Sequence, residues 1–586
     1  MSRTTSDVLV ERLIDWGVGV VFGLPGDGIN GIIEALRTRQ DRVAFVQVRH
    51  EESAALMACG YAKYTGRLGV CLATSGPGAI HLLNGLYDAR MDGAPVVALT
   101  GQTYHDLIGT RYQQEVDLLS LFKDVAVYNQ QVLGAGHVRA LVDAGCRAAL
   151  SLRGVAHLTC PVDIQEQAVK DDEPSRKKVE GHTSSAWRPP VTVPCDADIR
   201  AAADVLNSGK KTVILAGQGA LGAGAELEHL ADLMAAPIVK PLLGKAVVAD
   251  DSPFTTGGIG LLGTEPSEVA MEECDTLLMA GTSFPYMEFY PKHDRCRGVQ
   301  IDRDASRIGL RFPVEVGLCG DARATLTALA PHITRRGDRS FLEAAQARMG
   351  KWRELLDSRA HRDEVPMKPQ VIAHALNDLL ADDAIVSTDS GTVTTWAARH
   401  LQLKRGQLFS CSGNLATMAC GLPYAIAAAI AFPGRQSIAF VGDGGFSMLM
   451  AEFATAVKYR LPVKVVVVKN NTLGMIKWEQ MVFLGNPEYG VALEPIDFVR
   501  VAEACGGVGF RCERPEEARP ALEAMLLADG PALCEATVDP FEPPMPARVK
   551  PQQALHMAES LAKGQPNRGR IALTLFRDKV HDLKGR

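Results

Sequence analysis

The sequence predicts an α/β protein of three domains, each built on a parallel sheet flanked by helices. Short apolar runs that end in turns and lead into helical patterns recur along the chain, and this order is typical of parallel sheets covered on both faces. The first and last thirds repeat the pattern, which indicates one architecture used twice. The length of 586 residues agrees with about three or four domains.

The first domain is expected over residues 1–175. Four apolar runs predict its strands: Val20–Phe22, Phe45–Val48, Gly69–Ala73 and Pro95–Thr100. Ligands bind at the carboxyl ends of strands in such sheets. The residues that follow these runs are therefore the first candidates for a functional site.

The middle domain is expected over residues 193–335, after a polar linker over 171–192. Its predicted strands are Thr212–Ala216, Pro237–Lys240, Thr276–Ala280 and Gly298–Ile301. A charged helical connection over 336–366 leads to the last domain, expected over 367–545. The strands predicted there are Ala384–Thr388, Ser437–Val441, Val463–Lys469 and Ala532–Val538.

The tail over residues 551–586 differs from the rest of the chain. It carries seven Lys or Arg residues and three acidic residues, and several apolar residues fall near helical spacing, with Leu573 interrupting the stripe. A basic amphipathic helix can lie on an anionic membrane surface. It can also pack on the body of the protein or on a second subunit, and both interpretations stay open.

Composition excludes several classes of protein. Charged residues make up 22% and the net charge is −6, which is not the footprint of a nucleic-acid-binding protein. The 13 cysteines include no C-x-x-C pair, which argues against a zinc ribbon and a disulfide framework and fits a reducing compartment. The start of the sequence does not resemble a signal peptide. We therefore expect a cytoplasmic protein.

Polar residues follow two strong strands of the last domain. Asp443, flanked by glycines, comes after Ser437–Val441, and Asn470 comes some two dozen residues later, after Val463–Lys469. Carboxylate and amide oxygens are ligands that Mg²⁺ prefers, and Mg²⁺ often joins a protein carboxylate to substrate phosphates. Glycine turns at helix starts bind phosphate. The pair therefore predicts a site for Mg²⁺ and a diphosphate.

This spacing of Gly-Asp-Gly and Asn-Asn resembles the motif of the thiamin diphosphate enzymes of the pyruvate oxidase and acetolactate synthase group. The resemblance covers nearly the whole chain and implies a pyrimidine-binding domain, a middle domain and a diphosphate-binding domain. It implies that Asp443, Asn470 and the Thr472 carbonyl hold Mg²⁺. The implied thiamin diphosphate contacts in the last domain are Gly391, Thr392, Met418, Gly442, Gly444 and Gly445.

The resemblance also gives a role to Glu51, which follows a strand and opens a helix pattern. A carboxylate in an apolar wall can exchange a proton near neutral pH. In the family this acid protonates the aminopyrimidine of the cofactor, and the cofactor lies between two subunits. The implied partner residues in the first domain are Gly26, Asp27, Ser75 and Gln114, with Gln114 assigned to catalysis. A homodimer at minimum is expected, and a homotetramer is the fuller expectation.

The middle domain resembles the FAD-binding domain of pyruvate oxidase and of quinone-dependent pyruvate dehydrogenase. Glycines at strand ends admit a diphosphate, and an acid after a strand can bond a ribose. The implied FAD contacts are Gly217, Gly219, Gly281, Thr282, Asp302 and Asp321. In the quinone-dependent enzyme a basic amphipathic tail is a peripheral membrane-binding element. The resemblance therefore implies that the tail of this chain contacts the inner face of the cell membrane.

The resemblance implies oxidative decarboxylation of pyruvate or a close 2-keto acid through an enamine on thiamin diphosphate. The electrons then pass to FAD and on to a quinone or oxygen. The alternative is an acetolactate synthase-like carboligase with structural or no FAD, and a non-catalytic scaffold is the hypothesis of another class. Gln113 stands where relatives often have an aromatic residue. Gln113, Ile476, Trp478 and Glu479 are the predicted substrate contacts, the last three on a covering loop over Leu473–Gln480.

Overall fold

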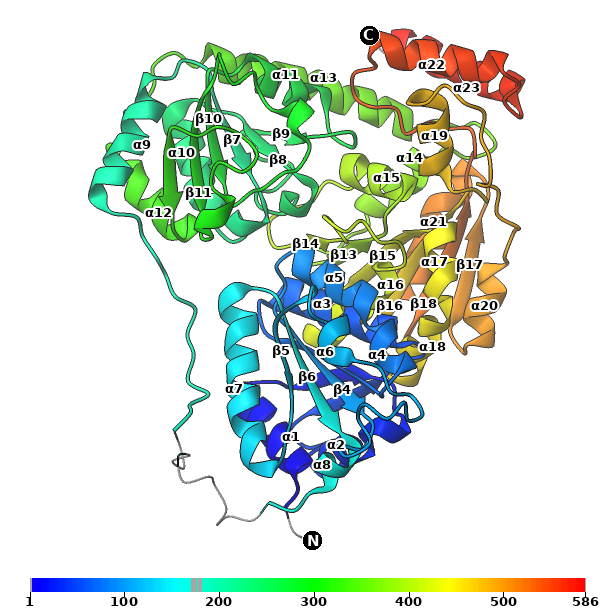
Figure 1. Cartoon of the computed structure of the whole chain (residues 1–586). Coiled ribbons are helices and arrows are strands. Elements are labelled where there is room, and N and C mark those ends of the chain that lie inside the picture. The colour runs from blue at the N-terminus through cyan, green and yellow to red at the C-terminus, as the bar shows by residue number, and fades with distance from the viewer. Residues whose placement is uncertain (1–2, 170–176, 178–181, 585–586) are drawn as a thin grey trace.

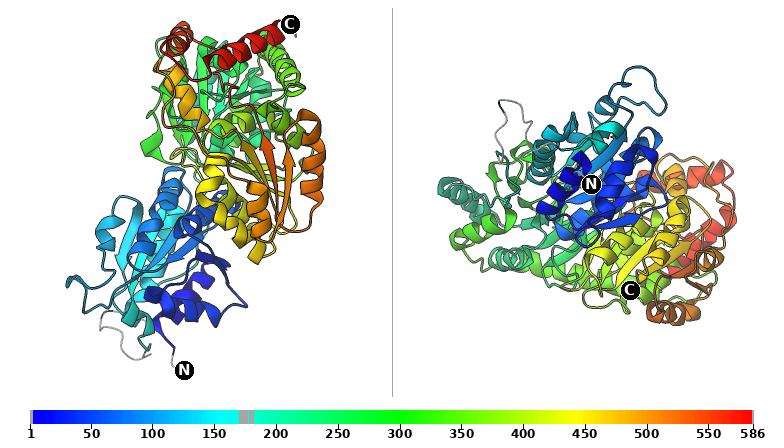
Figure 2. Two further views of the ribbon diagram at one scale, coloured as in Figure 1. Left: turned by 90° about the vertical axis from the view of Figure 1, so that its right-hand side faces the viewer. Right: turned by 90° about the horizontal axis from the view of Figure 1, so that it is seen from below.

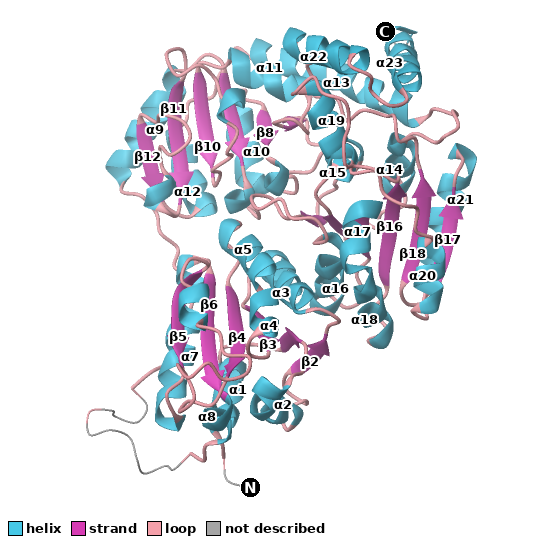
Figure 3. Cartoon of the chain, turned by 45° about the vertical axis from the view of Figure 1, so that its right-hand side comes forward, coloured by secondary structure: helices cyan, strands magenta, loops and turns pink. Residues whose placement is uncertain are grey.

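Three parallel six-stranded sheets with helices on their faces form the protein (Figure 1; Figure 3). The computed structural model describes residues 3–169, 177 and 182–584. The predicted fold class is therefore confirmed. Ten of the 22 residues of the predicted linker over 171–192 lie outside the described residues. The chain begins at the first-domain end of the molecule and finishes at the far end (Figure 2).

The first sheet has the strand order β2-β1-β3-β4-β6-β5. Its central strands are continuous buried apolar runs, as expected for a sheet covered on both faces. Its strands are β1 Val20–Gly23, β2 Ala44–Gln47, β3 Gly69–Ala73, β4 Val96–Gln102, β5 Ala126–Gln131 and β6 Val155–Pro161. Its main helices are α1 Thr5–Asp15, α2 Asn30–Arg37, α3 Glu51–Thr65, α4 Pro77–His81, α5 Leu83–Met91 and α7 Ala135–Leu152.

The middle sheet has the order β12-β11-β10-β7-β8-β9. Its strands are β7 Thr212–Ala216, β8 Ile238–Lys240, β9 Thr255–Gly258, β10 Thr276–Ala280, β11 Arg297–Asp302 and β12 Val316–Cys319. Its main helices are α9 Asp196–Ser208, α10 Gly224–Met234, α11 Glu265–Glu273 and α12 Ala322–Leu329. Helix α13 (Ser340–Ala360) forms the connection to the third domain.

The third sheet, ordered β14-β13-β15-β16-β18-β17, repeats the strand order of the first when the strands are counted from its start. The predicted repetition of one architecture is thereby found in the topology. Its strands are β13 Ile385–Thr388, β14 Leu408–Ser410, β15 Ser437–Gly442, β16 Val463–Lys469, β17 Val508–Cys512 and β18 Ala532–Thr537. Its main helices are α14 Pro369–Asn377, α15 Thr392–His400, α16 Gly421–Ala431, α17 Asp443–Leu449, α18 Phe453–Lys458, α19 Gly474–Val482, α20 Phe498–Ala504 and α21 Pro515–Leu527.

Helices α3 and α16 join the first and third domains in one continuous core. Gly60 of α3 lies against Tyr424 of α16, and a Cβ atom at Gly60 would come within 3.0 Å of the Tyr424 ring. A larger side chain would push the helices apart, so this glycine sets how closely the two domains pack.

The tail forms helices α22 (Pro551–Ala562) and α23 (Arg568–Lys584), which lie beside α19 (Figure 1). Met557 and Ile571 are buried against Trp478 of α19. Leu573 and Phe576 face solvent, with 47% and 66% of their surface exposed. Among the described residues, no helix is both long enough and apolar enough to cross a membrane.

Candidate active site

The two strand ends predicted to hold a metal are neighbours. Strands β15 and β16 pair in parallel, with Gly442 opposite Val468. Asp443 follows at the first residue of α17, and its Oδ2 accepts a hydrogen bond of 2.6 Å from the Asn471 amide. The Asn470 Oδ1 accepts one of 3.1 Å from the Thr472 amide. The carboxylate and amide oxygens are thus fixed at the same edge of the sheet.

Asp443 fits a cation. Its side chain is buried, and burial raises the pKa of its carboxyl group. Within the part of the chain that the structure describes, no Lys or Arg forms an ion pair with it. A buried carboxylate is costly without a positive partner. A divalent ion held with Asn470 and the Thr472 carbonyl would supply that partner, and oxygen donors suit Mg²⁺.

A second buried acid, Asp389, lies behind the glycine turn. A Cβ atom at Gly445 would come within 2.1 Å of the Asp389 Oδ2, so only glycine fits there. The Asp389 Oδ1 accepts a hydrogen bond of 3.1 Å from the Gly421 amide, whereas Oδ2 has no hydrogen-bond partner. Burial raises the pKa of Asp389 to about 6. Asp389 stands two residues before Gly391, one of the implied thiamin diphosphate contacts.

One cavity of about 1240 Å³ joins this site to the middle domain. The starts of helices α15 and α17 open onto it, and helix starts favour phosphate groups. Met418 also lines it, and its Cε would lie 3.4 Å from a Cβ atom at Gly444. The predicted third-domain residues in its wall are Gly391, Thr392, Met418, Gly442, Asp443, Gly444, Gly445, Asn470 and Thr472.

The middle-domain wall of the cavity contains the predicted flavin contacts. Gly219 and Gly281 touch through their backbones, and a Cβ atom at Gly281 would lie 2.6 Å from the Gly219 Cα. Only glycine fits at this close approach between the ends of β7 and β10. The predicted residues in this wall are Gly217, Gly219, Gly281, Thr282, Asp302 and Asp321.

Arg153 of the first domain also lines the cavity, and sequence analysis missed it. It ends α7 with a left-handed backbone at φ 49°, a position that usually favours glycine or asparagine. Burial and the nearby Arg303 lower the pKa of its guanidinium. A positive side chain in this wall fits an anionic ligand.

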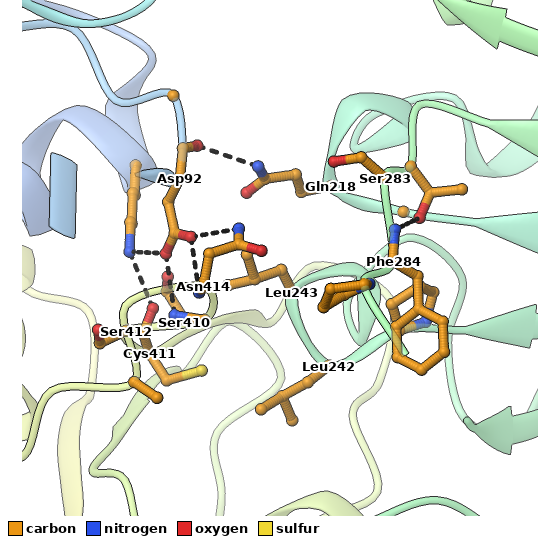
Figure 4. A pocket seen from close by; sticks show the side chains of 18 of the residues that line it. Asp92, Gln218, Leu242, Leu243, Ser283, Phe284, Ser410, Cys411, Ser412 and Asn414 are labelled. Carbon is orange, nitrogen blue, oxygen red and sulfur yellow. Dashed lines mark hydrogen bonds and ion pairs between the residues drawn. The ribbon is translucent and has the colours of Figure 1, made fainter. Parts of the chain in front are cut away.

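Asp92 ties all three domains together at the cavity (Figure 4). Its backbone carbonyl accepts a hydrogen bond of 3.0 Å from Gln218 of the middle domain. Its carboxylate accepts bonds from the Asn414 amide at 2.9 Å and from Lys63 at 2.6 Å. These contacts fix how the middle-domain wall sits relative to the third domain, and no sequence motif marks them.

The acid Glu51 lies in a separate cluster in the first domain. It is the first residue of α3 and is 7% exposed. Its Oε2 lies 2.9 Å from the Nδ1 of His81, and the His81 ring stacks on His50 with 4.5 Å between ring centres. A Cβ atom at Gly78 would lie 3.2 Å from the other carboxylate oxygen. No sequence pattern marks His81 as part of this cluster.

The strand ends of the first sheet bring the other predicted residues together. The Gly28 amide donates to the Thr74 hydroxyl at 3.0 Å, and that hydroxyl lies 3.3 Å from the Asp27 carboxylate. The Ser75 hydroxyl donates to Gln114 at 3.0 Å. A Cβ atom at Gly26 would lie 2.5 Å from Thr74.

Within one chain, the structure does not bring the Glu51 cluster of the first domain next to the Asp443 site of the third domain. The described residues that line the cavity with Asp443 do not include Glu51. Nor do they include the other predicted first-domain residues, which are Gly26, Asp27, Ser75, Gln113 and Gln114. Gln113 is exposed at the surface of the first domain.

The predicted covering loop over Leu473–Gln480 is instead helix α19, so that prediction was wrong. Ile476 and Glu479 line the cavity, and burial raises the pKa of Glu479. Trp478 lies on the opposite face, packed against the tail. The helix forms because the buried face of Trp478, Met481 and Val482 packs on the tail, which lies far away in the sequence.

Family models match a part of each of the three domains. The model "Thiamine pyrophosphate enzyme, N-terminal TPP binding domain" matches residues 3–121, the central-domain model matches 199–329, and the C-terminal TPP binding domain model matches 389–536. Bacillus subtilis YdaP, which is named for thiamine pyrophosphate and not for a reaction, is 43% identical over 96% of both chains.

Two further relatives carry the names of reactions. Pyruvate oxidase of Lactiplantibacillus plantarum is 34% identical over 92% of this chain and 89% of its own. Chloroplastic acetolactate synthase 2 of Brassica napus is 32% identical over 91% of this chain and 85% of its own. Both alignments extend over all three sheets.

Proposed function

The chain belongs to the thiamine pyrophosphate-dependent enzymes of the pyruvate oxidase and acetolactate synthase family, and on that premise we propose that it decarboxylates pyruvate or a close 2-keto acid oxidatively. The observation that carries the proposal is the single cavity that connects the Asp443 site with the glycine wall of the middle domain. Electrons released at one end can reach a flavin at the other without leaving the protein.

Third-domain residues bind the cofactor in this proposal. Asp443, Asn470 and the Thr472 carbonyl hold Mg²⁺, and the starts of α15 and α17 hold the diphosphate. Met418 lies beside Gly444 and supports the rings of the cofactor. Bound thiamin diphosphate supplies the carbon nucleophile for the keto group. Ile476 and Glu479 of α19 face the same space and orient the keto acid.

The proton at the pyrimidine is exchanged by Glu51 of a second subunit. Support comes from the separation of Glu51 and Asp443 within one chain, because each needs a complementary surface that its own chain does not place beside it. Gly26, Asp27, Ser75 and Gln114 lie near Glu51 and line the same pyrimidine surface, with Gln114 beside the reacting carbon. The active assembly is a homodimer at minimum, and two dimers form the proposed homotetramer.

The middle-domain wall binds FAD in the proposal. Gly217, Gly219 and Gly281 leave room for its diphosphate, and Asp302 and Asp321 accept hydrogen bonds from its adenosine. Arg153 offsets its negative charge. FAD bound there would supply the electron acceptor, and a quinone or oxygen would be the final oxidant.

A carboligase is the second candidate function, because acetolactate synthases align over as much of the chain as pyruvate oxidase does. In that case a second keto acid enters the cavity and FAD, if bound, has a structural role. Gln113 bears on this choice, because an amide there makes the donor or acceptor pocket more polar.

A panel of keto acids tests the two functions. The purified protein with thiamin diphosphate, Mg²⁺ and FAD is mixed with each acid without oxygen, and flavin bleaching and acetolactate formation are followed together. We expect pyruvate to bleach the flavin and acetate to accumulate. Acetolactate formation with an unchanged flavin spectrum would favour the carboligase, and no turnover of any keto acid would exclude both.

The tail gives the proposed enzyme a peripheral membrane contact at the inner face of the cell membrane. Support comes from the exposed Leu573 and Phe576 beside the basic Arg577 and Lys579. Flotation with anionic vesicles in the presence of substrate tests this proposal. Changing Leu573 and Phe576 to Glu should abolish binding, whereas changing the exposed Leu527 to Glu should leave it intact.

A further inference from the structure

A carboxylate from the third domain holds the backbone that leads into Glu51. The Glu452 Oε1 accepts hydrogen bonds from the Arg49 amide at 2.8 Å and from the His50 amide at 2.9 Å. Both amides lie between the end of β2 and the start of α3, where neither sheet nor helix supplies a partner. The Glu452 Oε2 accepts a further bond of 2.7 Å from Thr455.

The contact is buried and belongs to a wider attachment. Glu452 is 1% exposed, so its two hydrogen bonds to the first domain are shielded from water. The Gln47 amide donates to the Tyr459 hydroxyl at 2.7 Å, and Lys458 also contacts the Gln47 side chain. Helix α18 therefore lies along the end of β2 (Figure 3).

Glu452 also belongs to the segment that carries the metal-site carboxylate. Helix α17 begins at Asp443 and continues into the short helix Met450–Glu452. One helical segment thus begins at Asp443, the proposed Mg²⁺ ligand. It ends at Glu452, which holds the backbone before Glu51.

We propose that Glu452 is a positioning residue that fixes Glu51 for the partner's cofactor and thereby links the two active sites of a dimer. The inference rests on the proposed function, in which Glu51 and Asp443 of one chain serve different cofactors. Small displacements at a reacting group can lower rates by about 100-fold. The link is mechanical, since Glu452 binds the backbone amides of Arg49 and His50, which lead into Glu51.

Single substitutions test the positioning role. Glu452→Leu should lower kcat by about 10- to 100-fold, with thiamin diphosphate and Mg²⁺ affinities unchanged because the Asp443 site is intact. Glu452→Gln keeps an acceptor oxygen for both amides and should restore most of kcat. Glu542→Leu, which removes another buried third-domain carboxylate, is the matched control and should keep kcat per folded dimer. Wild-type turnover in Glu452→Leu would overturn the proposal.

Mixed dimers with two affinity tags test which site Glu452 serves. Each proposed site combines Glu51 of one chain with Asp443 of the other. Glu452→Leu in one chain and Asp443→Asn in the other therefore damage the same site, and the second site should retain about half the activity. The two substitutions placed in one chain, opposite a wild-type chain, should damage both sites. Equal inactivity of the two arrangements would overturn the proposal.

A reference dimer separates this inference from the proposed function. Glu51→Gln in one chain and Asp443→Asn in the other should also retain about half the activity. If this reference is inactive, the shared-site function itself fails. If the reference is active and the Glu452 dimer is not, only the role of Glu452 fails. Should Glu452→Leu not fold, Thr455→Val frees one carboxylate oxygen and should give the same pattern more weakly.

Discussion

The carboxylate of Glu51 lies 2.9 Å from the Nδ1 of His81, although the two residues stand on different helices of the first domain. His50 stacks on the His81 ring, and Gly78 lacks the Cβ atom that would lie 3.2 Å from the other carboxylate oxygen. The acid is therefore held in one orientation, and its second oxygen lies beside a glycine.

Replacing His81 by Ala should lower kcat about tenfold or more, because the Glu51 carboxylate loses the ring that orients it. Steady-state kinetics with saturating cofactor measure this effect. His105, an exposed histidine that pairs with Asp163, provides the control, and His105→Ala should keep wild-type kcat. Equal losses in the two variants would argue against an orienting role for His81.

Glu51→Gln should lower kcat by about 100- to 10,000-fold, because an amide does not exchange the pyrimidine proton. The protein should still bind thiamin diphosphate, as measured by calorimetry. Glu52→Gln is the neighbouring control, since the Glu52 Oε1 accepts a hydrogen bond from Asn84 at 2.6 Å and plays no part in the proposed chemistry. Normal turnover in Glu51→Gln would contradict the assignment.

Asp443→Asn should abolish most of the thermal stabilisation that Mg²⁺ and thiamin diphosphate give to the protein. Ligands that bind only the folded state raise the melting temperature in proportion to the logarithm of their concentration over Kd. Thermal melts at several cofactor concentrations measure the change. Asp497→Asn alters an acid far from the cavity and should leave the stabilisation intact.

Asp389 should make the cofactor-free protein less stable as the pH rises. Its pKa is raised to about 6 in the folded protein because burial disfavours the charged form. Stability from the neutral acid is full below the unfolded pKa near 4 and is lost as the pH rises through 6, with a total effect of about 3 kcal/mol. Asp389→Asn should therefore raise the free energy of unfolding at pH 8, and by only about half as much at pH 5.

Urea unfolding at the two pH values measures this difference. Asp382→Asn replaces an acid whose side chain is 90% exposed and should show no such pH dependence. An equal effect of Asp389→Asn at pH 5 and pH 8 would mean that the carboxyl group does not titrate between them.

Asp302→Ala should weaken FAD binding about 10- to 100-fold, because the flavin would lose a hydrogen bond to a charged acceptor. Quenching of flavin fluorescence during titration of the flavin-free protein reports the affinity without any turnover. Asp196→Ala changes a surface acid that pairs with Arg200 and should bind FAD normally. Unchanged affinity in Asp302→Ala would place the flavin elsewhere or exclude it.

Sequence patterns were sufficient to predict the three-domain architecture and the two strand ends that carry Asp443 and Asn470. Central strands such as Val463–Lys469 are buried on both faces, so they contain apolar runs, here Val465–Val468, that are visible in the sequence. Gly445 is required locally because any side chain would collide with Asp389. Strand β5 (Ala126–Gln131) was missed because it is a half-exposed edge strand with polar residues.

Tertiary structure alone decided which residues meet across the domains. The sequence by itself determined the three-domain architecture and the positions of Asp443, Asn470 and Glu51, because a strand, its turn and its helix start are local features. It carried no sign that His81 contacts Glu51, that Glu452 holds the backbone before it, or that Trp478 turns away from the cavity. Those contacts join residues far apart in the chain, and the packing of whole helices and sheets against one another selects them.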